Sequence, residues 1–125
     1  MGEEVGNMKN IVIFRLKRWW PPDAPRHEQF DCYEAILAGT KTSEWRGYKE
    51  YWMDRLFKEV KDPRYPGTPI LKPKVTRAWF TVGFPKGNVP RLEADIKNIL
   101  VHKDEQGYAD QLEIQVENVV EVLDP

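Results

Sequence analysis

Short apolar runs alternate along the chain with stretches rich in proline, glycine and charge, and the spacing of the apolar positions predicts the elements. From about residue 26 to residue 38, Tyr33 and Ile36 belong to an apolar stripe at helical spacing. Gly39 follows where a helix end needs a residue able to adopt a positive φ. From Tyr48 to about Val60, aromatic and leucine side chains recur in the same way and predict a second amphipathic helix.

Strands are predicted where β-branched and apolar residues form short runs or alternate with polar residues. The first run extends from Ile11 to Leu16 and is expected to be a central strand. The segments between the later strands are rich in glycine, proline, asparagine and aspartate, so we predict turns there. The later strand candidates are Val75 to Val82, Leu92 to Val101 and Leu112 to Val122, and the turns are Gly83 to Asn88 and Asp104 to Gly107.

Two proline-rich stretches interrupt this pattern. Trp19 to Pro25 contains three prolines, and Asp62 to Lys74 contains four. Proline lacks an amide donor and restricts the residue before it, so both stretches are predicted to be loops. For the tryptophans of the first loop two interpretations stay open. They form a platform on which a base stacks, or a hydrophobic lid over the barrel, and the usual burial of tryptophan slightly favours the lid.

Candidate chemistry concentrates in the residues after Gly39. In an extended segment Thr42, Glu44 and Arg46 share one face, because side chains alternate along a strand, and Lys41 lies at the turn before it. With one early strand and three late strands, this segment brings the number of strands to about five. We therefore predict an α+β fold, a small mixed β-barrel of about five or six strands with two flanking helices.

The pattern Gly39-x-Lys41-x-x-Glu44-x-Arg46 resembles the signature of the ASCH domain family, a branch of the PUA-like fold. The preceding helix, the stretch from Tyr48 to Leu56 and the pair Gly83-Phe84 add to the resemblance, which covers roughly residues 10 to 122. It implies a PUA-like barrel that recognises RNA or a modified nucleoside in a cleft beside the motif.

Composition agrees with one globular domain. The chain has 125 residues, of which 41% are hydrophobic and 31% charged, and no apolar run approaches the ~20 residues of a membrane helix. We expect a loose tail over residues 1–9 and a single domain over residues 10–125. Cys32 is the only cysteine, which fits a reducing, cytoplasmic compartment, and we interpret it as a packing residue. Two histidines and one cysteine without ligand spacing predict no metal site, and we expect no cofactor.

The net charge of −1 argues against a protein that coats nucleic acid by charge alone. The charges are unevenly distributed, however. Residues 41 to 77 contain ten Lys or Arg and five Asp or Glu, whereas residues 78 to 125 contain four and nine. Two interpretations are equally open: one face attracts phosphate while another repels it, or the two halves interleave in space and cancel.

Each motif residue also has an ordinary structural interpretation. Lys41 would be favoured next to a helix end by the helix dipole, and Glu44 and Arg46 would form a simple surface ion pair. Taken together, Lys41, Glu44 and Arg46 are better explained by a functional site than by these structural roles. We expect Lys41 and Glu44 to be the catalytic candidates if the protein is an enzyme. The expected ligand-binding residues are Gly39, Thr42, Arg46, Lys49, Tyr51, Arg55, Phe84 and Trp20.

Three alternative hypotheses for the function follow from these observations. The first hypothesis is an RNA- or nucleoside-binding module with no membrane partner and an oligomeric state left open. The second is a small hydrolase, because one branch of the family is similar to an amidohydrolase of acetylated cytidine and other relatives to a ribonuclease. In that branch a threonine stands where this chain has Glu44, and no helix predicted here supplies the later glutamate. The third is a domain that binds another protein through apolar surface near Trp19 and Trp20.

Overall fold

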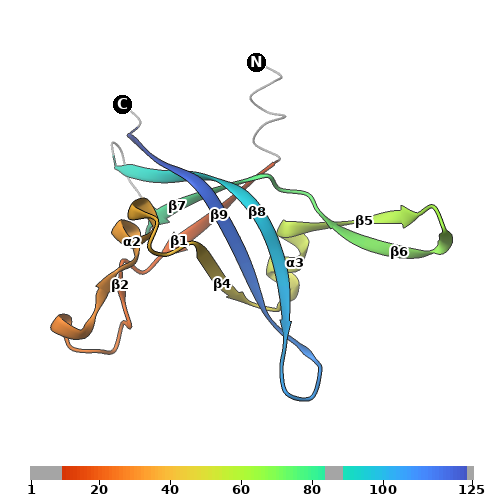
Figure 1. Ribbon diagram of the computed structural model, residues 1–125, viewed down its shortest axis with the longest axis horizontal. Coiled ribbons are helices and arrows are strands. Elements are labelled where there is room, and N and C mark those ends of the chain that lie inside the picture. Colours follow the sequence, from red (N-terminus) through yellow and green to blue (C-terminus); the bar gives the residue numbers. More distant parts are fainter. Residues whose placement is uncertain (1–9, 84–88, 124–125) are drawn as a thin grey trace.

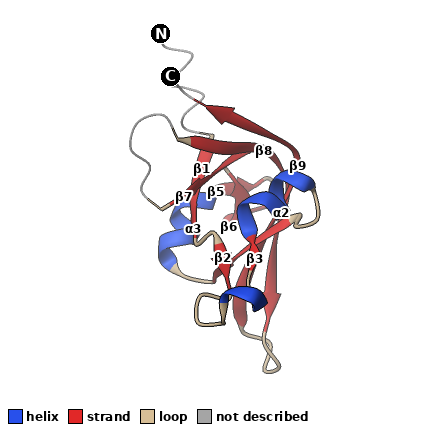
Figure 2. Ribbon diagram, turned by 90° about the vertical axis from the view of Figure 1, so that its left-hand side faces the viewer, coloured by secondary structure: helices blue, strands red, loops and turns tan. Residues whose placement is uncertain are grey.

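Five strands form one curled, mixed sheet. The computed structural model describes residues 10–83 and 89–123 (Figure 1). In the sheet β1 is parallel to β7, the other neighbours are antiparallel, and the strands curl into a half-barrel (Figure 2). This confirms the predicted α+β class and the number of barrel strands. In sheet order the strands are β1 (Ile11–Leu16), β7 (Arg77–Val82), β8 (Pro90–Lys103), β9 (Ala109–Leu123) and β4 (Ser43–Gly47).

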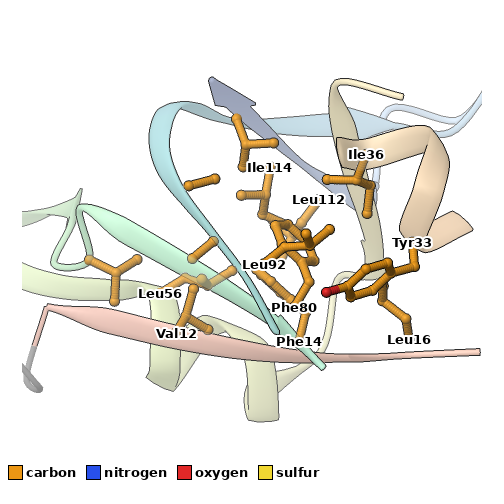
Figure 3. Close-up of a cluster of buried hydrophobic side chains, with 14 residues drawn as sticks. Val12, Phe14, Leu16, Tyr33, Ile36, Leu56, Phe80, Leu92, Leu112 and Ile114 are labelled. Carbon is orange, nitrogen blue, oxygen red and sulfur yellow. The ribbon is translucent and has the colours of Figure 1, made fainter. Parts of the chain in front are cut away.

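The core fills the inside of this curl. On β1 the side chains alternate, so that Phe14 is buried while Arg15 is exposed. Phe14 stacks on Phe80 of β7 with ring centroids 5.6 Å apart. Figure 3 shows these rings surrounded by side chains from β8, β9 and the two flanking helices, α2 (Cys32–Ala38) and α3 (Glu50–Leu56). Tyr33 of α2 also donates a hydrogen bond to Glu121 of β9 at 2.7 Å, which fixes the helix on the sheet.

The prediction that β1 is central is wrong. β1 is at one end of the strand order and pairs only with β7 among the described strands. An apolar run does not distinguish a central strand from an edge strand in this sheet, because the interior strands β8 and β9 alternate between more and less buried positions as β1 does. β1 has one face on the core and the other in solvent.

The first helix is shorter than its predicted range. A 3-10 helix covers Arg26–Glu28, and β3 (Phe30–Asp31) then pairs antiparallel with β2 (Trp19–Trp20), so the predicted loop over Trp19 to Pro25 begins as a strand. α2 starts after Asp31, whose carboxylate accepts the amide of Glu34 at 3.1 Å and caps the helix. The predicted end is confirmed, because Gly39 has a φ of 81° and closes the helix with bonds to two carbonyls of its last turn.

The second helix and the second loop also differ from prediction. α3 ends at Leu56, and β5 (Phe57–Asp62) pairs with β6 (Tyr65–Pro73) in a two-stranded ribbon that projects away from the sheet (Figure 1). Prolines such as Pro69 and Pro73 are tolerated because each strand of such a ribbon has one unpaired side, where a missing amide donor costs little.

The three late strands are confirmed. β8 and β9 extend beyond their predicted bounds at both ends, whereas β7 begins two residues later than predicted and ends at Val82 as predicted. The predicted turn from Asp104 to Gly107 is also present, closed by the Asp104 amide donating to the Tyr108 carbonyl at 2.8 Å. The predicted tail over residues 1–9 and most of the predicted turn from Gly83 to Asn88, with Phe84, lie outside the described residues.

The ribbon places Lys58 and Lys72 directly opposite each other, both exposed. Like charges in this position destabilise a strand pair. Replacing Lys72 by Glu should therefore raise the free energy of unfolding by about 0.5 kcal/mol, measured by urea denaturation. The matched control is Lys61→Glu, because Lys61 lies opposite Pro69 and should give no comparable gain. A Lys72→Glu protein no more stable than the parent would contradict this account.

Candidate binding cavity

A cavity of about 510 Å³ lies between the β2–β3 pair, the end of β1 and β4. We call it the base cavity. Lys41, Glu44 and Arg46 all line it. The structure therefore brings together the three residues that the motif singled out, with Glu44 and Arg46 on one strand face as the alternation predicts. The cavity is also lined by Trp20, Phe30 and Cys32.

Glu44 is the polar centre of this cavity. Only 7% of the residue is exposed. Its Oε1 accepts a hydrogen bond from the backbone amide of Trp45 at 3.2 Å. The same oxygen lies 3.1 Å from Nη1 of Arg46 and 3.4 Å from Nζ of Lys41. Its other oxygen, Oε2, is buried and accepts no hydrogen bond from the residues that the structure describes. The carboxylate is thus neutralised on one side and unpartnered on the other.

Arg46 is held from several directions. Its Nη1 donates to the Trp45 carbonyl at 2.9 Å, and its Nη2 donates to the carbonyl of Arg15 at 3.2 Å. The guanidinium also lies 5.1 Å from the ring centroid of Phe14 and 5.4 Å from that of Trp52. Because Arg15 belongs to β1, Arg46 connects the two strands at opposite ends of the sheet order.

Lys41 is mostly withdrawn from solvent, with 22% of its side chain exposed. Its Nζ donates to the carbonyl of Ser43 in addition to approaching Glu44. Its backbone amide bonds to Ala35 of α2, so the turn that ends the helix also aims this side chain at the cavity. Lys41 is therefore an ordered cation rather than a free surface lysine.

An aromatic pair forms another part of the cavity lining. Trp20 and Phe30 lie opposite each other in the β2–β3 pair, and they are 46% and 47% exposed. Sequence reasoning missed Phe30, because it assigned this residue to the first helix. A signal was present: Asp31 followed by Glu34 three residues later is a pattern typical of a helix start, which would have left Phe30 outside the helix.

The remaining predicted ligand-binding residues are spread over other places. Thr42 lines a shallow hollow of about 420 Å³ that also includes Lys41 and Phe30. Tyr51 and Arg55 line a second cavity beside α3, described below. Gly39 and Lys49 line none of these three cavities. Gly39 caps α2, and Lys49 is exposed at the start of α3. Phe84 lies outside the described residues.

Cys32 lines the base cavity, but its thiol is expected to be unreactive. The residue is buried, and burial raises the pKa of its thiol above the ordinary value. A thiol with a raised pKa carries little thiolate at neutral pH and is a poor nucleophile. This fits the interpretation of Cys32 as a packing residue.

A polar cluster lies on strands β4, β8 and β9. Ser43 donates to Oε2 of Glu113 at 2.6 Å, and Oε1 of Glu113 lies 2.8 Å from Nε2 of His102. These hydrogen bonds, Ser43 first and His102 second, lower the pKa of the Glu113 carboxyl. The ring of His102 also packs against Trp45, with centroids 4.8 Å apart.

Comparisons of this chain with family models, with curated proteins and with solved structures gave no match. Across residues 10–83 and 89–123, no three or more His, Cys, Asp or Glu side chains form a group that could hold a metal ion. The helices within these ranges are also too short or too polar to cross a membrane.

Replacing Arg46 by Ala should destabilise the fold. Among the described residues, the change leaves the buried Glu44 with Lys41 as its one paired cation, and it removes the bond to β1. Breaking such a pair costs about 3 kcal/mol. Urea denaturation measures the loss. Arg55→Ala is the control, because Arg55 is exposed and its removal should cost less than about 1 kcal/mol. Equal stabilities of the two variants would show that Arg46 does not hold the site together.

Replacing Ser43 by Ala should raise the pKa of Glu113 toward its ordinary value, because it removes the largest cause of the lowered pKa. A depressed pKa stabilises the fold above the ordinary pKa, and this contribution is lost as the pH falls through the folded-state pKa. The variant should therefore lose less stability than the parent across that acid window. Carboxyl NMR titration measures the pKa. Gln115→Ala should give a smaller rise, and an unchanged pKa in Ser43→Ala would refute the assignment.

Proposed function

We propose that this protein binds RNA or a modified nucleoside, as an ASCH domain of the PUA-like class, and that a base enters the base cavity. The observation that carries the proposal is the buried Glu44 carboxylate, which has one unpartnered oxygen and lies in a cavity lined by aromatic side chains. The match of Gly39, Lys41, Glu44 and Arg46 to the family signature supports the same proposal.

The state of Glu44 favours a ligand that donates hydrogen bonds. A buried acceptor without a partner costs about 1–3 kcal/mol, more when it is charged. A ligand whose N–H group reaches Oε2 removes this cost. Nucleobases carry such donors as amino and imino groups on their edges, and acidic side chains accept from them. Binding would require a small opening around Oε2, because this atom is buried in the unbound protein.

The lining of the cavity suits a planar ring. Trp20 and Phe30 present half-exposed aromatic surface, and stacking of one base on an aromatic side chain contributes about 1–3 kcal/mol. A volume of about 510 Å³ is within the range of small-ligand sites, which are apolar cavities with a few fixed polar groups. Glu44, Lys41 and Arg46 would be those groups here.

Replacing Trp20 by Ala should weaken RNA binding about tenfold or more, through loss of stacking. The measurement is fluorescence anisotropy with labelled single-stranded RNA, accompanied by a melting curve. Trp20 is a better target than Arg46 because its half-exposed side chain is not part of the core cluster. The matched control is Tyr108→Ala, an exposed aromatic in the β8–β9 turn outside the base cavity. Equal RNA affinity of the two folded variants would argue against the base cavity.

A small hydrolase is the second candidate. It is favoured by one observation, the approach of Lys41 Nζ to Glu44 Oε1 at 3.4 Å beside the base cavity, because an ordered lysine and a carboxylate can together act in proton transfer. The discriminating assay incubates the protein with acetylated cytidine and with RNA and follows both by chromatography. Intact substrates after long incubation would remove this candidate and leave the binding module.

A further inference from the structure

A second cavity of about 430 Å³ lies between β1, α3 and Val75. Its described lining contains three arginines, Arg15, Arg46 and Arg55, and no acidic residue. The rest of the lining is apolar or aromatic, including Tyr51 and Trp52. We call this the arginine cavity. Its composition is that of an anion site rather than of a plain hydrophobic groove.

Arg55 is pre-positioned in the arginine cavity. Its guanidinium lies 3.4 Å from the ring centroid of Tyr51, and its Nη1 donates to the Tyr51 carbonyl at 3.0 Å. Tyr51 in turn packs edge-on against Trp52, with centroids 4.9 Å apart. The hydrogen bonds given by the described residues engage only Nη1 of Arg55. A stacked guanidinium of this kind keeps N–H groups available for the oxygens of a phosphate.

The two cavities are neighbours, because Arg15 and Arg46 line both. The Arg46 guanidinium bonds to the backbone of Arg15 on one side and contacts Glu44 of the base cavity on the other. A ligand that fills both cavities therefore meets an aromatic-walled space that contains Glu44 and, next to it, a space whose described lining has three arginines and no acidic side chain. Base and phosphate are joined in this way in a nucleotide.

We propose that the arginine cavity binds a phosphate group of the same nucleic-acid strand whose base enters the base cavity. The ligand is then a nucleotide within an RNA strand and not a free nucleoside. This inference rests on the proposed function and narrows it. Arg55 contacts the phosphate oxygens, and Arg46 separates phosphate from base.

The test compares four probes on the full chain: the ordinary ribonucleosides, their monophosphates, a labelled mixed-sequence RNA of about ten nucleotides, and inorganic phosphate as competitor. Monophosphates should bind at least about tenfold more tightly than nucleosides. Arg55→Gln should weaken RNA binding about tenfold and reduce the slope of log affinity against log salt by about 0.7, the value for one phosphate contact on a single strand. Inorganic phosphate should compete with the monophosphates.

The matched control is Arg64→Gln. Arg64 is exposed on the β5–β6 ribbon and lines neither cavity, so both the RNA affinity and the salt slope should stay those of the parent. Melting curves of both variants are the check that the fold is kept.

The failures are distinguishable. If nucleosides bind as tightly as their monophosphates and Arg55→Gln behaves like Arg64→Gln, the phosphate site is refuted and the base cavity stands. If Arg55→Gln weakens RNA binding while Trp20→Ala does not, the base cavity is refuted, and with it the link between the two cavities. If neither RNA nor any nucleotide binds, both proposals fall.

Discussion

The arrangement of the half-barrel and its cavities depends on keeping one carboxylate out of water. Burial of Glu44 is tolerable only with cations beside it, and Lys41 and Arg46 supply them. Arg46 lies two residues after Glu44 on β4, and it also bonds to the backbone of β1. The same ion cluster therefore joins the two ends of the strand order and separates the base cavity from the arginine cavity.

Local rules predicted the parts of this arrangement that depend on nearby residues. The positive φ at Gly39 follows from a helix that ends beside it, and the shared face of Glu44 and Arg46 follows from strand alternation. Four of the five barrel strands follow from apolar runs long enough to be recognised one by one, and β4 follows from the extended motif segment after Gly39. In each case the information lies within a few residues, so periodicity and turn chemistry suffice.

Pairing between distant or unusual segments could not be predicted in this way. Trp20 meets Phe30 only because two very short strands pair across the proline-containing segment between them, and no period of two or of 3.6 is visible in two residues. The β5–β6 ribbon was hidden by its prolines, which exclude a central strand but not a strand with a free side. The arginine cavity could not be predicted from local pattern either, because its lining comes from β1, β4, α3 and Val75, which are distant from one another in the sequence.

The basic middle and the acidic end of the chain lie together at some places in the fold and apart at others. Arg77, from the basic middle of the chain, lies 2.7 Å from Asp95 of the acidic end, so at β7 and β8 the two halves interleave and cancel. At the arginine cavity the described lining contains no acidic side chain, and of its arginines Arg46 pairs with Glu44 of the base cavity. The chain has a net charge of −1, and its basic and acidic residues pair at β7 and β8, whereas three arginines line the arginine cavity. For the proposed ligand, arginines clustered beside an aromatic cavity would favour recognition of one nucleotide over non-specific coating of a strand.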